Sequence, residues 1–266
     1  QAFMAWQMPV LAPANVAEMI EFGLYGWALS RYSGAWVGLT ALSEVVESAG
    51  TVDLDVLNAR MAAWVDEGTV RALTAHQTPA DGLHYRWPDL PSLRLETRLA
   101  DKRAAVAAFS AVNRIDRLII AAPQAKVGIV TAGKAHLDFM EVLRRLQITP
   151  AMLDAAGVRV LKLGLTYPVE TTGLNAFASG LQELLVVEEK GAVVETQLHT
   201  LFYNAPDGER PAILETLEDT PFYARSLVRV DRQGPSAIGT QETLCLDRFQ
   251  RRWVQFLLPY RMRREP

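Results

Sequence analysis

Short apolar runs and amphipathic segments alternate along residues 125–213. Strands that are buried on both faces of a sheet have this apolar composition, which occurs at residues 127–130, 158–163 and 184–187. Apolar residues at spacings of three and four, typical of helices with one buried face, occur over residues 137–146, 172–180 and 193–203. Strands separated by helices of this length pair in parallel through right-handed crossovers. The pattern therefore predicts a doubly wound α/β domain with a mainly parallel sheet.

The carboxyl ends of parallel strands are where α/β sheets bind ligands and partner domains. These ends are predicted at residues 131–134, 164–168 and 188–190. Thr131-Ala-Gly-Lys134 places backbone N–H groups and a lysine at the start of a helix, which favours a bound anion. We therefore expect Thr131, Gly133 and Lys134 to hold an anion; the alternative is a tight turn whose lysine is solvated. The glycine spacing differs from that of a P-loop, so nucleotide hydrolysis is not expected.

Two adjacent carboxylates end the third strand. Glu188 and Glu189 are expected to point to opposite faces, so they cannot share one substrate proton. We expect one of them to bridge to Lys190 or to a neighbouring domain. Residues 166–168 are expected to redirect the chain after the second strand, and we assign them no chemistry.

The first 48 residues predict one helix followed by one short strand. Asn15 favours a helix N-cap, and Glu18 three residues later completes a pattern that resembles a capping box. Residues 30–34 are expected to end the helix, and residues 35–40 to form a short buried strand. One helix and one strand are too little to close a sheet, so we expect the last α/β unit of a domain whose other parts lie outside this chain.

The predicted turn after this helix contains Arg31 and Tyr32, which are candidates to contact a partner chain or a ligand. The alternative is a simple helix end, with the arginine interacting with the last carbonyl groups. Gly23 and Gly26 lie inside the same helix, where each costs about 1 kcal/mol relative to alanine. Either a neighbouring backbone approaches them closely or the helix is merely weakened.

Residues 49–124 have weaker periodicity and are expected to connect two α/β pieces. We expect an amphipathic helix around residues 56–65, a loop over residues 69–82, a helix over residues 93–113 and a strand over residues 117–121. His84-Tyr-Arg-Trp-Pro-Asp89 interleaves aromatic and charged residues without a surrounding basic cluster. This segment therefore indicates an anchored loop rather than a nucleic-acid contact.

The bulk composition excludes several classes of protein. The 266 residues carry a net charge of −3, which gives no electrostatic case for nucleic acid or an anionic membrane. No apolar run approaches the roughly 20 residues that span a bilayer. The single cysteine, Cys245, cannot form a disulfide within the chain or by itself ligate a zinc ion or an iron–sulfur cluster. The four histidines are scattered, so a metal site is not expected, and a cytoplasmic location fits the cysteine count.

Residues 221–266 differ in character, with nine arginines and no lysine. A basic amphipathic interaction segment is one interpretation. A disordered or artefactual C-terminus, unrelated to the preceding fold, is the other.

Six long blocks of this sequence carry a family resemblance. Three lie near the start, at Met8-Pro-Val-Leu-Ala-Pro-Ala-Asn-Val16, residues 23–38, and Gly82-Leu-His-Tyr-Arg-Trp-Pro-Asp89. Three follow, at Lys126-Val-Gly-Ile-Val-Thr-Ala-Gly-Lys134, Lys162-Leu-Gly-Leu-Thr-Tyr-Pro168, and Leu185-Val-Val-Glu-Glu-Lys190. These blocks resemble indolepyruvate:ferredoxin oxidoreductase. The resemblance runs in register from residue 1 to about 213, and long blocks in one order are more specific than a lone glycine-rich turn.

The resemblance implies an enzyme that oxidatively decarboxylates an aryl 2-oxo acid such as indolepyruvate to an acyl-CoA. The complete enzyme would use thiamine diphosphate, Mg²⁺, [4Fe-4S] clusters and coenzyme A, and would pass electrons to ferredoxin. The anion expected at residues 131–134 would then be a phosphate of coenzyme A or a carboxylate of a partner domain. The remaining domains or subunits of the enzyme are the expected partners, in an oligomer.

The resemblance also implies a domain map. Residues 1–48 would be the end of a pyrimidine-binding domain, and residues 49–124 a connecting segment. Residues 125–213 would form a transketolase-C-terminal-like domain, and residues 214–266 would be a divergent arginine-rich tail. Because the resemblance fades after residue 213, a shifted reading frame or a misjoined fragment is our hypothesis for the tail.

None of the family's catalytic residues transfers to a position in this sequence. The thiamine-activating glutamate lies upstream of the matched part, and the Gly-Asp-Gly…Asn diphosphate motif and the cluster cysteines are missing from this sequence. We therefore expect a fragment that supplies scaffold and interface and binds none of these cofactors alone. The alternative is a non-catalytic α/β binding or assembly module.

Overall fold

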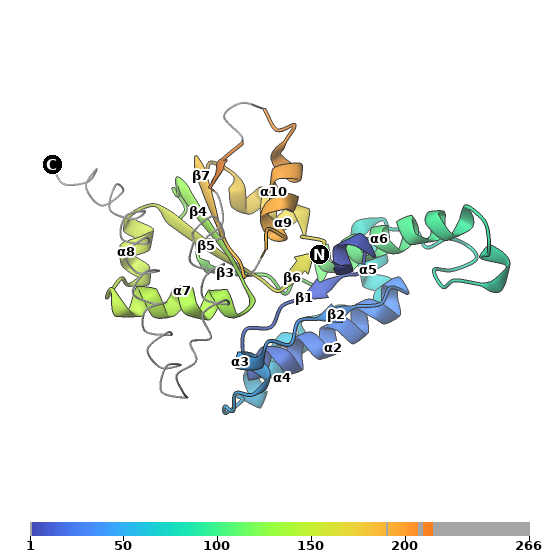
Figure 1. The fold of residues 1–266 in the computed structure, drawn as a ribbon, viewed down its shortest axis with the longest axis horizontal. Helices are drawn as coiled ribbons and strands as arrows, with labels where there is room; N and C mark the ends of the chain where they lie inside the picture. The colour runs from blue at the N-terminus through green and yellow to red at the C-terminus, as the bar shows by residue number, and fades with distance from the viewer. Residues whose placement is uncertain (1, 190, 207–209, 215–266) are drawn as a thin grey trace, which may run out of the picture. The chain divides into compact units, whose positions relative to one another are not determined.

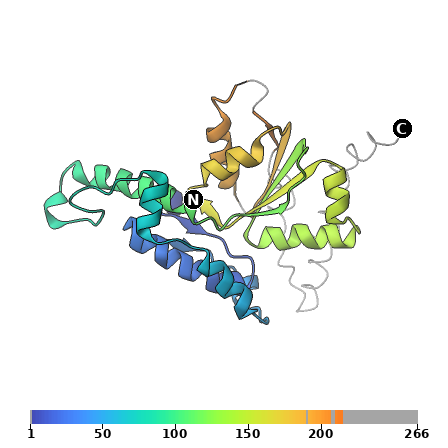
Figure 2. The ribbon, with the colours of Figure 1, turned by 180° about the vertical axis from the view of Figure 1, so that it is seen from behind.

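The computed structural model describes residues 2–189, 191–206 and 210–214. Contacts divide the chain into two compact units (Figures 1 and 2). Unit 1 comprises Gln1–Arg117 and Leu163–Phe177, and unit 2 comprises Leu118–Lys162 and Ala178–Pro266. The chain therefore leaves the first unit, returns to it for a short segment, and completes the second.

Unit 1 is mainly helical and has a small three-stranded sheet. Its helices are α1 (Ala2–Ala5), α2 (Val16–Ser33), α3 (Ser43–Val46), α4 (Leu54–Ala62), α5 (Glu67–Thr74), the 3₁₀ helix η1 (Trp87–Asp89), α6 (Arg94–Val112) and α9 (Thr171–Ala178, up to Phe177). The strand order is β2 (Gly38–Leu39), β1 (Val10–Leu11), β6 (Leu165–Tyr167). β1 pairs in parallel with β2 and antiparallel with β6. The segment β1–α2–β2 is thus a parallel crossover unit, and β6 pairs with the edge of β1 that faces away from β2.

Helix α2 begins and ends where the local signals predict. The Asn15 side chain accepts a hydrogen bond from the Glu18 N–H at 3.0 Å, as an N-cap does. The Glu18 carboxylate accepts the Ala14 N–H at 2.8 Å, one residue before the position that a capping box would use. Gly34 adopts a left-handed conformation with φ of 66° and ends the helix.

The core of unit 1 lies between α2 and α6. Tyr25, Leu29 and Phe109 are buried there, and the Tyr25 and Phe109 rings meet edge to face with centroids 5.4 Å apart. Two further buried side chains of α2 are carboxylates, Glu18 and Glu21. Arg117 binds them at 2.9 and 2.5 Å, so their charges are compensated inside the unit.

Unit 2 contains a five-stranded sheet with helices on both faces (Figures 1 and 2). The strand order is β3 (Arg117–Ile120), β5 (Val158–Leu163), β4 (Val127–Ala132), β7 (Glu183–Val187), β8 (Ala212–Leu214). The helices are α7 (Gly133–Arg145), α8 (Pro150–Ala155) and α10 (Val194–Phe202). β4 pairs in parallel with β7, and β7 pairs in parallel with β8. The predicted α/β class with parallel strands is confirmed.

Every residue of β4 is buried, as its continuous apolar run predicts. On α7, Phe139, Val142 and Leu143 are buried, whereas Leu137 remains partly exposed. The apolar positions of this helix thus face the sheet in the predicted pattern, with one exception.

The structure differs from the sequence expectations in unit 1. The loop expected at residues 69–82 begins with most of α5, because Asp66 caps that helix and Val70 is fully buried. The buried strand expected at residues 35–40 is limited to the two residues of β2, and Trp36 is exposed. Residues 164–168, expected to form a strand end, contain β6. The other predicted helices and strands are present with boundaries shifted by a few residues, and the His84–Asp89 segment is anchored through buried Asp89.

The predicted four-segment domain map stays a prediction. Residues 163–177, assigned to one domain with residues 125–213, are part of unit 1. The arginine-rich tail lies outside the described residues from position 215 onward.

Candidate functional site

The carboxyl ends of β4 and β7 lie side by side in the parallel sheet of unit 2. Thr131 in β4 is opposite Val187 in β7, so Ala132 and Glu188 follow at the same edge. This is the edge at which we expected an anion site, and both strands lead directly into helix starts or turns there.

Thr131 is fully buried, and its hydroxyl contacts groups inside the unit. The Thr131 Oγ1 lies 2.9 Å from His136 Nδ1 and donates to the Leu161 carbonyl oxygen at 3.3 Å. The Leu161 carbonyl belongs to β5, so the hydroxyl links the start of α7 to a second strand. Thr131 thus has a role in packing the strand end.

Gly133 and Lys134 form the first residues of α7. Gly133 has a φ of 51°, a left-handed conformation that favours glycine. Ala132, at the N-cap position, provides no side-chain hydrogen bond, and the first turn contains no acidic residue. The Lys134 Nζ donates to Asp138 at 2.8 Å, one helical turn onward. The structure thus brings the three predicted residues together at one turn, and the anion site itself stays a prediction.

The Glu188 carboxylate binds the N-terminus of α10, six residues further along the chain. Its side chain is buried and accepts hydrogen bonds from the Val194 N–H at 2.9 and 3.1 Å and from the Glu195 N–H at 3.1 Å. Burial raises the pKa of Glu188 above its ordinary value, and the backbone donors oppose that rise. The carboxylate takes the place at the N-terminus of α10 that an external anion would use. The bridge expected from this pair to Lys190 is not tested, because Lys190 lies outside the described residues.

Glu170 in unit 1 makes the same kind of cap. Its carboxylate accepts the Thr172 N–H at 2.7 Å and the Gly173 N–H at 2.6 Å, at the start of α9. Arg114 lies 3.8 Å from it. Acidic residues that follow strands thus fill helix N-termini in both units.

Arg31 and Tyr32 point in different directions. Arg31 is exposed, whereas Tyr32 is buried among Phe109, His76 and Arg71. The Tyr32 hydroxyl has no hydrogen-bond partner, and burial raises its pKa. Of the two, only Arg31 has its side chain in solvent, and the contact of either residue with a partner or ligand stays a prediction.

Comparisons with known proteins relate most of the chain to one family. Residues 117–220 match the family profile described as the indolepyruvate oxidoreductase domain. Indolepyruvate oxidoreductase subunit IorA of Methanothermobacter thermautotrophicus is 25% identical over 227 residues, which cover 80% of this chain and 32% of that protein. IorA of Pyrococcus abyssi is 29% identical over 198 residues, covering 72% of this chain and 27% of that protein.

Up to residue 220, the chain is thus similar to part of the indolepyruvate oxidoreductases. It spans about a third of the length of the curated IorA relatives that it matches. A solved 2-oxoglutarate:ferredoxin oxidoreductase from Magnetococcus marinus is 15% identical, with a TM-score of 0.46, over 79% of this chain and 39% of that chain.

The end of the chain is similar to a different family. Residues 195–266 match the profile described as carotenoid hydratase CrtC. Acyclic carotenoid 1,2-hydratase of Thiocapsa roseopersicina is 53% identical over 57 residues, 21% of this chain and 14% of that protein. The match to carotenoid hydratase begins at residue 195, and the match to indolepyruvate oxidoreductase ends at residue 220.

The described residues include no candidate metal group. Across residues 2–189, 191–206 and 210–214, no three His, Cys, Asp or Glu side chains gather where they could hold a metal ion. Nor does this part of the chain contain a helix long and apolar enough to span a membrane.

Two partners in this region were missed from the sequence. His136 binds Thr131, and Asp138 binds Lys134. The four-residue spacing of Lys134 and Asp138 is a helical ion-pair signal that was readable in advance. The Thr131–His136 contact depends on the turn at Gly133, and the sequence gives no comparable signal for it.

Proposed function

We propose that this chain is part of an enzyme that oxidatively decarboxylates indolepyruvate, or a related aryl 2-oxo acid, to an acyl-CoA. Ferredoxin would accept the electrons, as in the family that the sequence resembles. The observation that carries the proposal is the similarity to IorA, which extends over 80% of the chain.

The proposed share of this chain is scaffold and interface. The complete enzyme would use thiamine diphosphate, Mg²⁺ and [4Fe-4S] clusters, held by other domains or subunits, and coenzyme A, to which this chain would contribute one anion site. Two facts support this division: the single cysteine in 266 residues and the lack of a candidate metal group among the described side chains. The proposed setting is the cytoplasm, in an oligomer with the remaining parts of the enzyme.

The start of α7 is the place where this chain would contribute to coenzyme A binding. Backbone N–H groups at a helix N-terminus favour a phosphate, and Lys134 would move from Asp138 to the anion. The existing Lys134–Asp138 pair is partly exposed, and such pairs contribute only about 0.3–0.5 kcal/mol. In the complete enzyme, Lys134→Ala should raise the KM for coenzyme A, whereas Lys126→Ala at an exposed site should not. An unchanged KM in Lys134→Ala would remove the phosphate role.

The test of the function is a chimera of IorA from Methanothermobacter thermautotrophicus in which residues 1–213 of this chain replace the matching third. Assembled with its companion subunits, the chimera should reduce ferredoxin in an indolepyruvate-dependent reaction. A matched chimera with Glu188→Ala, which removes the cap of α10, controls for local misfolding of unit 2. A chimera that assembles and binds thiamine diphosphate but reduces no ferredoxin would contradict the proposal.

A non-catalytic binding or assembly module is the second candidate. The observation that favours it is the filling of helix N-termini by Glu170 and Glu188, which leaves fewer places for a small anionic ligand. In that case the chimera would assemble through protein contacts and show no dependence on indolepyruvate. The same assay therefore separates the two candidates.

A further inference from the structure

Lys102 is a buried lysine on α6 of unit 1. Only 5% of the residue is exposed. Its Nζ lies 3.7 Å from the centre of the Tyr85 ring, over the ring face. Among the described residues, no carboxylate or other hydrogen-bond acceptor is in contact with this Nζ. Lysines that are buried to this extent are almost always paired with an acceptor, so an unpaired one requires an explanation.

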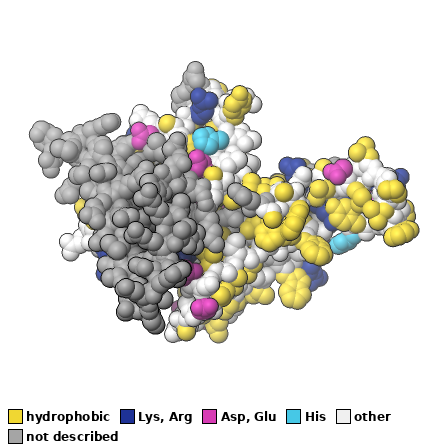
Figure 3. All heavy atoms as spheres, in the orientation of Figure 1, with side chains coloured by type: hydrophobic (Ala, Val, Ile, Leu, Met, Phe, Trp, Pro, Cys, Tyr) yellow, Lys and Arg dark blue, Asp and Glu magenta, His cyan; other side chains and the backbone are white. Residues whose placement is uncertain are grey.

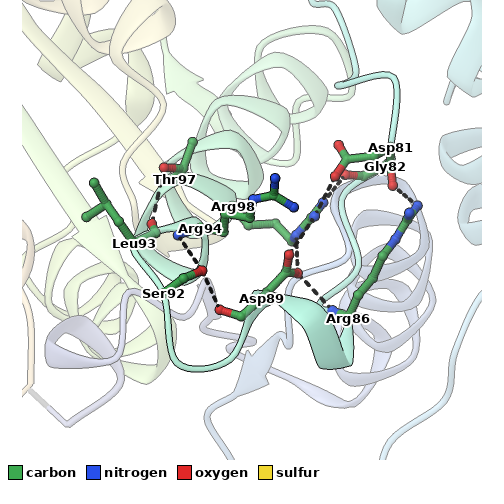
Figure 4. A network of polar contacts seen from close by, with 9 residues as sticks. All are labelled: Asp81, Gly82, Arg86, Asp89, Ser92, Leu93, Arg94, Thr97 and Arg98. Atoms are coloured by element: carbon green, nitrogen blue, oxygen red, sulfur yellow. Dashed lines mark hydrogen bonds and ion pairs between the residues drawn. The ribbon is translucent and has the colours of Figure 1, made fainter.

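The aspartates of the neighbouring loop bind Arg98 instead (Figure 4). The Arg98 guanidinium donates to Asp89 at 2.8 and 3.2 Å, to Asp81 at 2.6 Å and to the Gly82 carbonyl oxygen at 2.6 Å, contacts that we call the Arg98 network. Lys102 follows Arg98 by four residues, so the two side chains lie on the same face of α6. Lys102 therefore has a cation, and no compensating anion, as its neighbour on this face.

The surroundings of Lys102 disfavour its ammonium form. Burial lowers the pKa of Lys102, and the positive charge of Arg98 lowers it further. A larger share of this amine is therefore uncharged near neutral pH than in an ordinary exposed lysine. An uncharged lysine next to another cation is a nucleophile. The uncharged amine can still direct an N–H at the face of the Tyr85 ring.

The position of the amine restricts what can react with it. The Lys102 Nζ is not one of the fully enclosed side-chain atoms that lack a partner, so it retains some contact with solvent. With 5% of the residue exposed, this opening admits only a small reactant. The adjacent loop exposes apolar side chains, including Trp87 and Leu90, and Figure 3 shows hydrophobic side chains gathered over this end of unit 1. An uncharged and apolar electrophile fits these surroundings best.

We propose that Lys102 binds carbon dioxide as a carbamate. The uncharged Nζ attacks the carbon of CO₂ and forms an N–C bond, while one C=O π bond breaks and leaves its electron pair on oxygen. The nitrogen releases one proton to solvent, and no group is oxidised or reduced. Carbon dioxide is small, uncharged and apolar, as the opening requires.

Arg98 favours the carbamate over the ammonium. The carbamate is negatively charged, so the repulsion between Lys102 and Arg98 becomes an attraction. A guanidinium has five N–H donors, and the Arg98 network uses four of them, which leaves one Nη1–H for the new oxygen atoms. The reaction proposed for the complete enzyme releases CO₂, but the carbamate does not rest on that function, because dissolved CO₂ reacts in the same way.

Chemical trapping locates the carbamate. The full chain is incubated with ¹³C-labelled bicarbonate at about pH 7.5 in a closed vessel and treated with triethyloxonium, which converts carbamates to stable ethyl esters. Mass spectrometry of the digested chain should find at least tenfold more label on Lys102 than on Lys126, an exposed lysine. Lys102→Arg retains a cation on α6 and removes the amine, so it should carry no label at this position. Absence of label from Lys102, or equal label on the two lysines, would overturn the proposal.

Two measurements without a trapping reagent accompany this test. The ¹³C NMR spectrum of the full chain in labelled bicarbonate should contain a carbamate resonance that disappears in Lys102→Arg and remains in Lys126→Arg. The midpoint of thermal unfolding should rise with CO₂ at constant pH and ionic strength, because the folded state binds it, and Lys102→Arg should show a smaller rise. Lys102→Met is the second variant if the arginine disturbs α6. An unchanged carbamate spectrum in a folded Lys102 variant would overturn the proposal.

Discussion

In unit 2, the central strand β4 is buried along its whole length, and the strand-end carboxylate of Glu188 is used within the unit. In unit 1, Trp27, Trp36 and Trp87 are largely exposed although the same unit contains a tightly packed core around Tyr25. Among the described residues, unit 1 exposes several tryptophans, whereas the large exposed ring of unit 2 is that of Tyr203. Exposed apolar side chains of this size are more often found at interaction sites than elsewhere on a surface, which agrees with the interface role proposed for this chain.

The two units also differ in how charge is used. Unit 1 buries an arginine with two aspartates, one of them fully buried, to hold an exposed loop. Unit 2 uses its charged groups mainly at helix starts and on exposed helix faces, as with Glu141 between Arg144 and Arg145. Buried ion pairs add little net stability compared with apolar packing, so their use here points to a need for a defined loop position.

The largest expected effect is at Arg98. Arg98→Met leaves the buried Asp89 carboxylate with the Arg86 N–H but without a compensating positive charge, which should lower the free energy of unfolding of unit 1 more than the substitutions that follow. Urea unfolding followed by tryptophan fluorescence measures the loss. Arg94→Met, at an exposed position of the same helix, should change stability by less than about 0.5 kcal/mol. Equal losses in the two variants would mean that the loop is not held by the Arg98 network.

A smaller effect is expected at Gly164, which packs inside unit 1. A Cβ there would lie 2.8 Å from Ile115 and 2.9 Å from Phe22, so Gly164→Ala should cost about 1–3 kcal/mol through overpacking. Gly23→Ala should instead stabilise α2 by about 0.5–1 kcal/mol, because its Cβ meets open space. Thermal unfolding of both variants compares them, and opposite signs are the expected result.

A pH-dependent effect is expected in unit 2. Because burial holds the pKa of Glu188 above its ordinary value of 4.5, the folded state keeps the proton to a higher pH than the unfolded state. The contribution of Glu188 to stability should therefore fall as the pH rises from about 4.5 through the folded pKa. Glu188→Gln should lack this dependence, so the wild type should lose stability relative to the variant over that range. Urea titrations at pH 4.5 and pH 7 would show it, and the opposite trend would mean that the backbone donors outweigh burial.

The smallest effect is expected at Lys134. Its pair with Asp138 is partly exposed, so Lys134→Ala should change the free energy of unfolding by less than about 0.5 kcal/mol. Raising the salt concentration should shrink even this difference. A decrease of more than about 1 kcal/mol in the free energy of unfolding would show that Lys134 is needed for the fold, and Lys134 could not then leave Asp138 to bind an anion.

Local signals in the sequence predicted the elements that they control. Asn15 and Gly34 mark the ends of α2 by chemistry that acts within a few residues. The apolar run of β4 likewise identifies a strand in a parallel sheet. For such elements, the sequence and the structure agree because the determining contacts are short in range.

Long-range contacts could not be predicted in this way. β6 forms because its residues pair with β1, and the Thr166 hydroxyl donates to the Val10 carbonyl oxygen 156 positions away. Helix α5 depends on the burial of Val70 against the rest of unit 1. At the candidate site, the use of Glu188 as a helix cap depends on where α10 begins, which periodicity alone places only to within a few residues.

The tail shows a further limit of periodicity and composition. Its arginines suggested an interaction segment or an unrelated C-terminus, and neither interpretation named a family. The similarity of residues 195–266 to carotenoid hydratase CrtC came from comparison alone. The hypothesis of a misjoined fragment can now be tested by sequencing the coding DNA across residues 195–220, where the two family matches overlap.

We propose above all that this chain supplies scaffold and interface rather than the thiamine diphosphate site of an indolepyruvate oxidoreductase. Calorimetric titration of the full chain with thiamine diphosphate and Mg²⁺ tests it most directly. We expect no heat of binding. Cooperative unfolding of the chain in the same buffer is the control that shows that it is folded. Tight binding of one thiamine diphosphate per chain would contradict the account, because the site would then be built from residues to which we assign packing and capping.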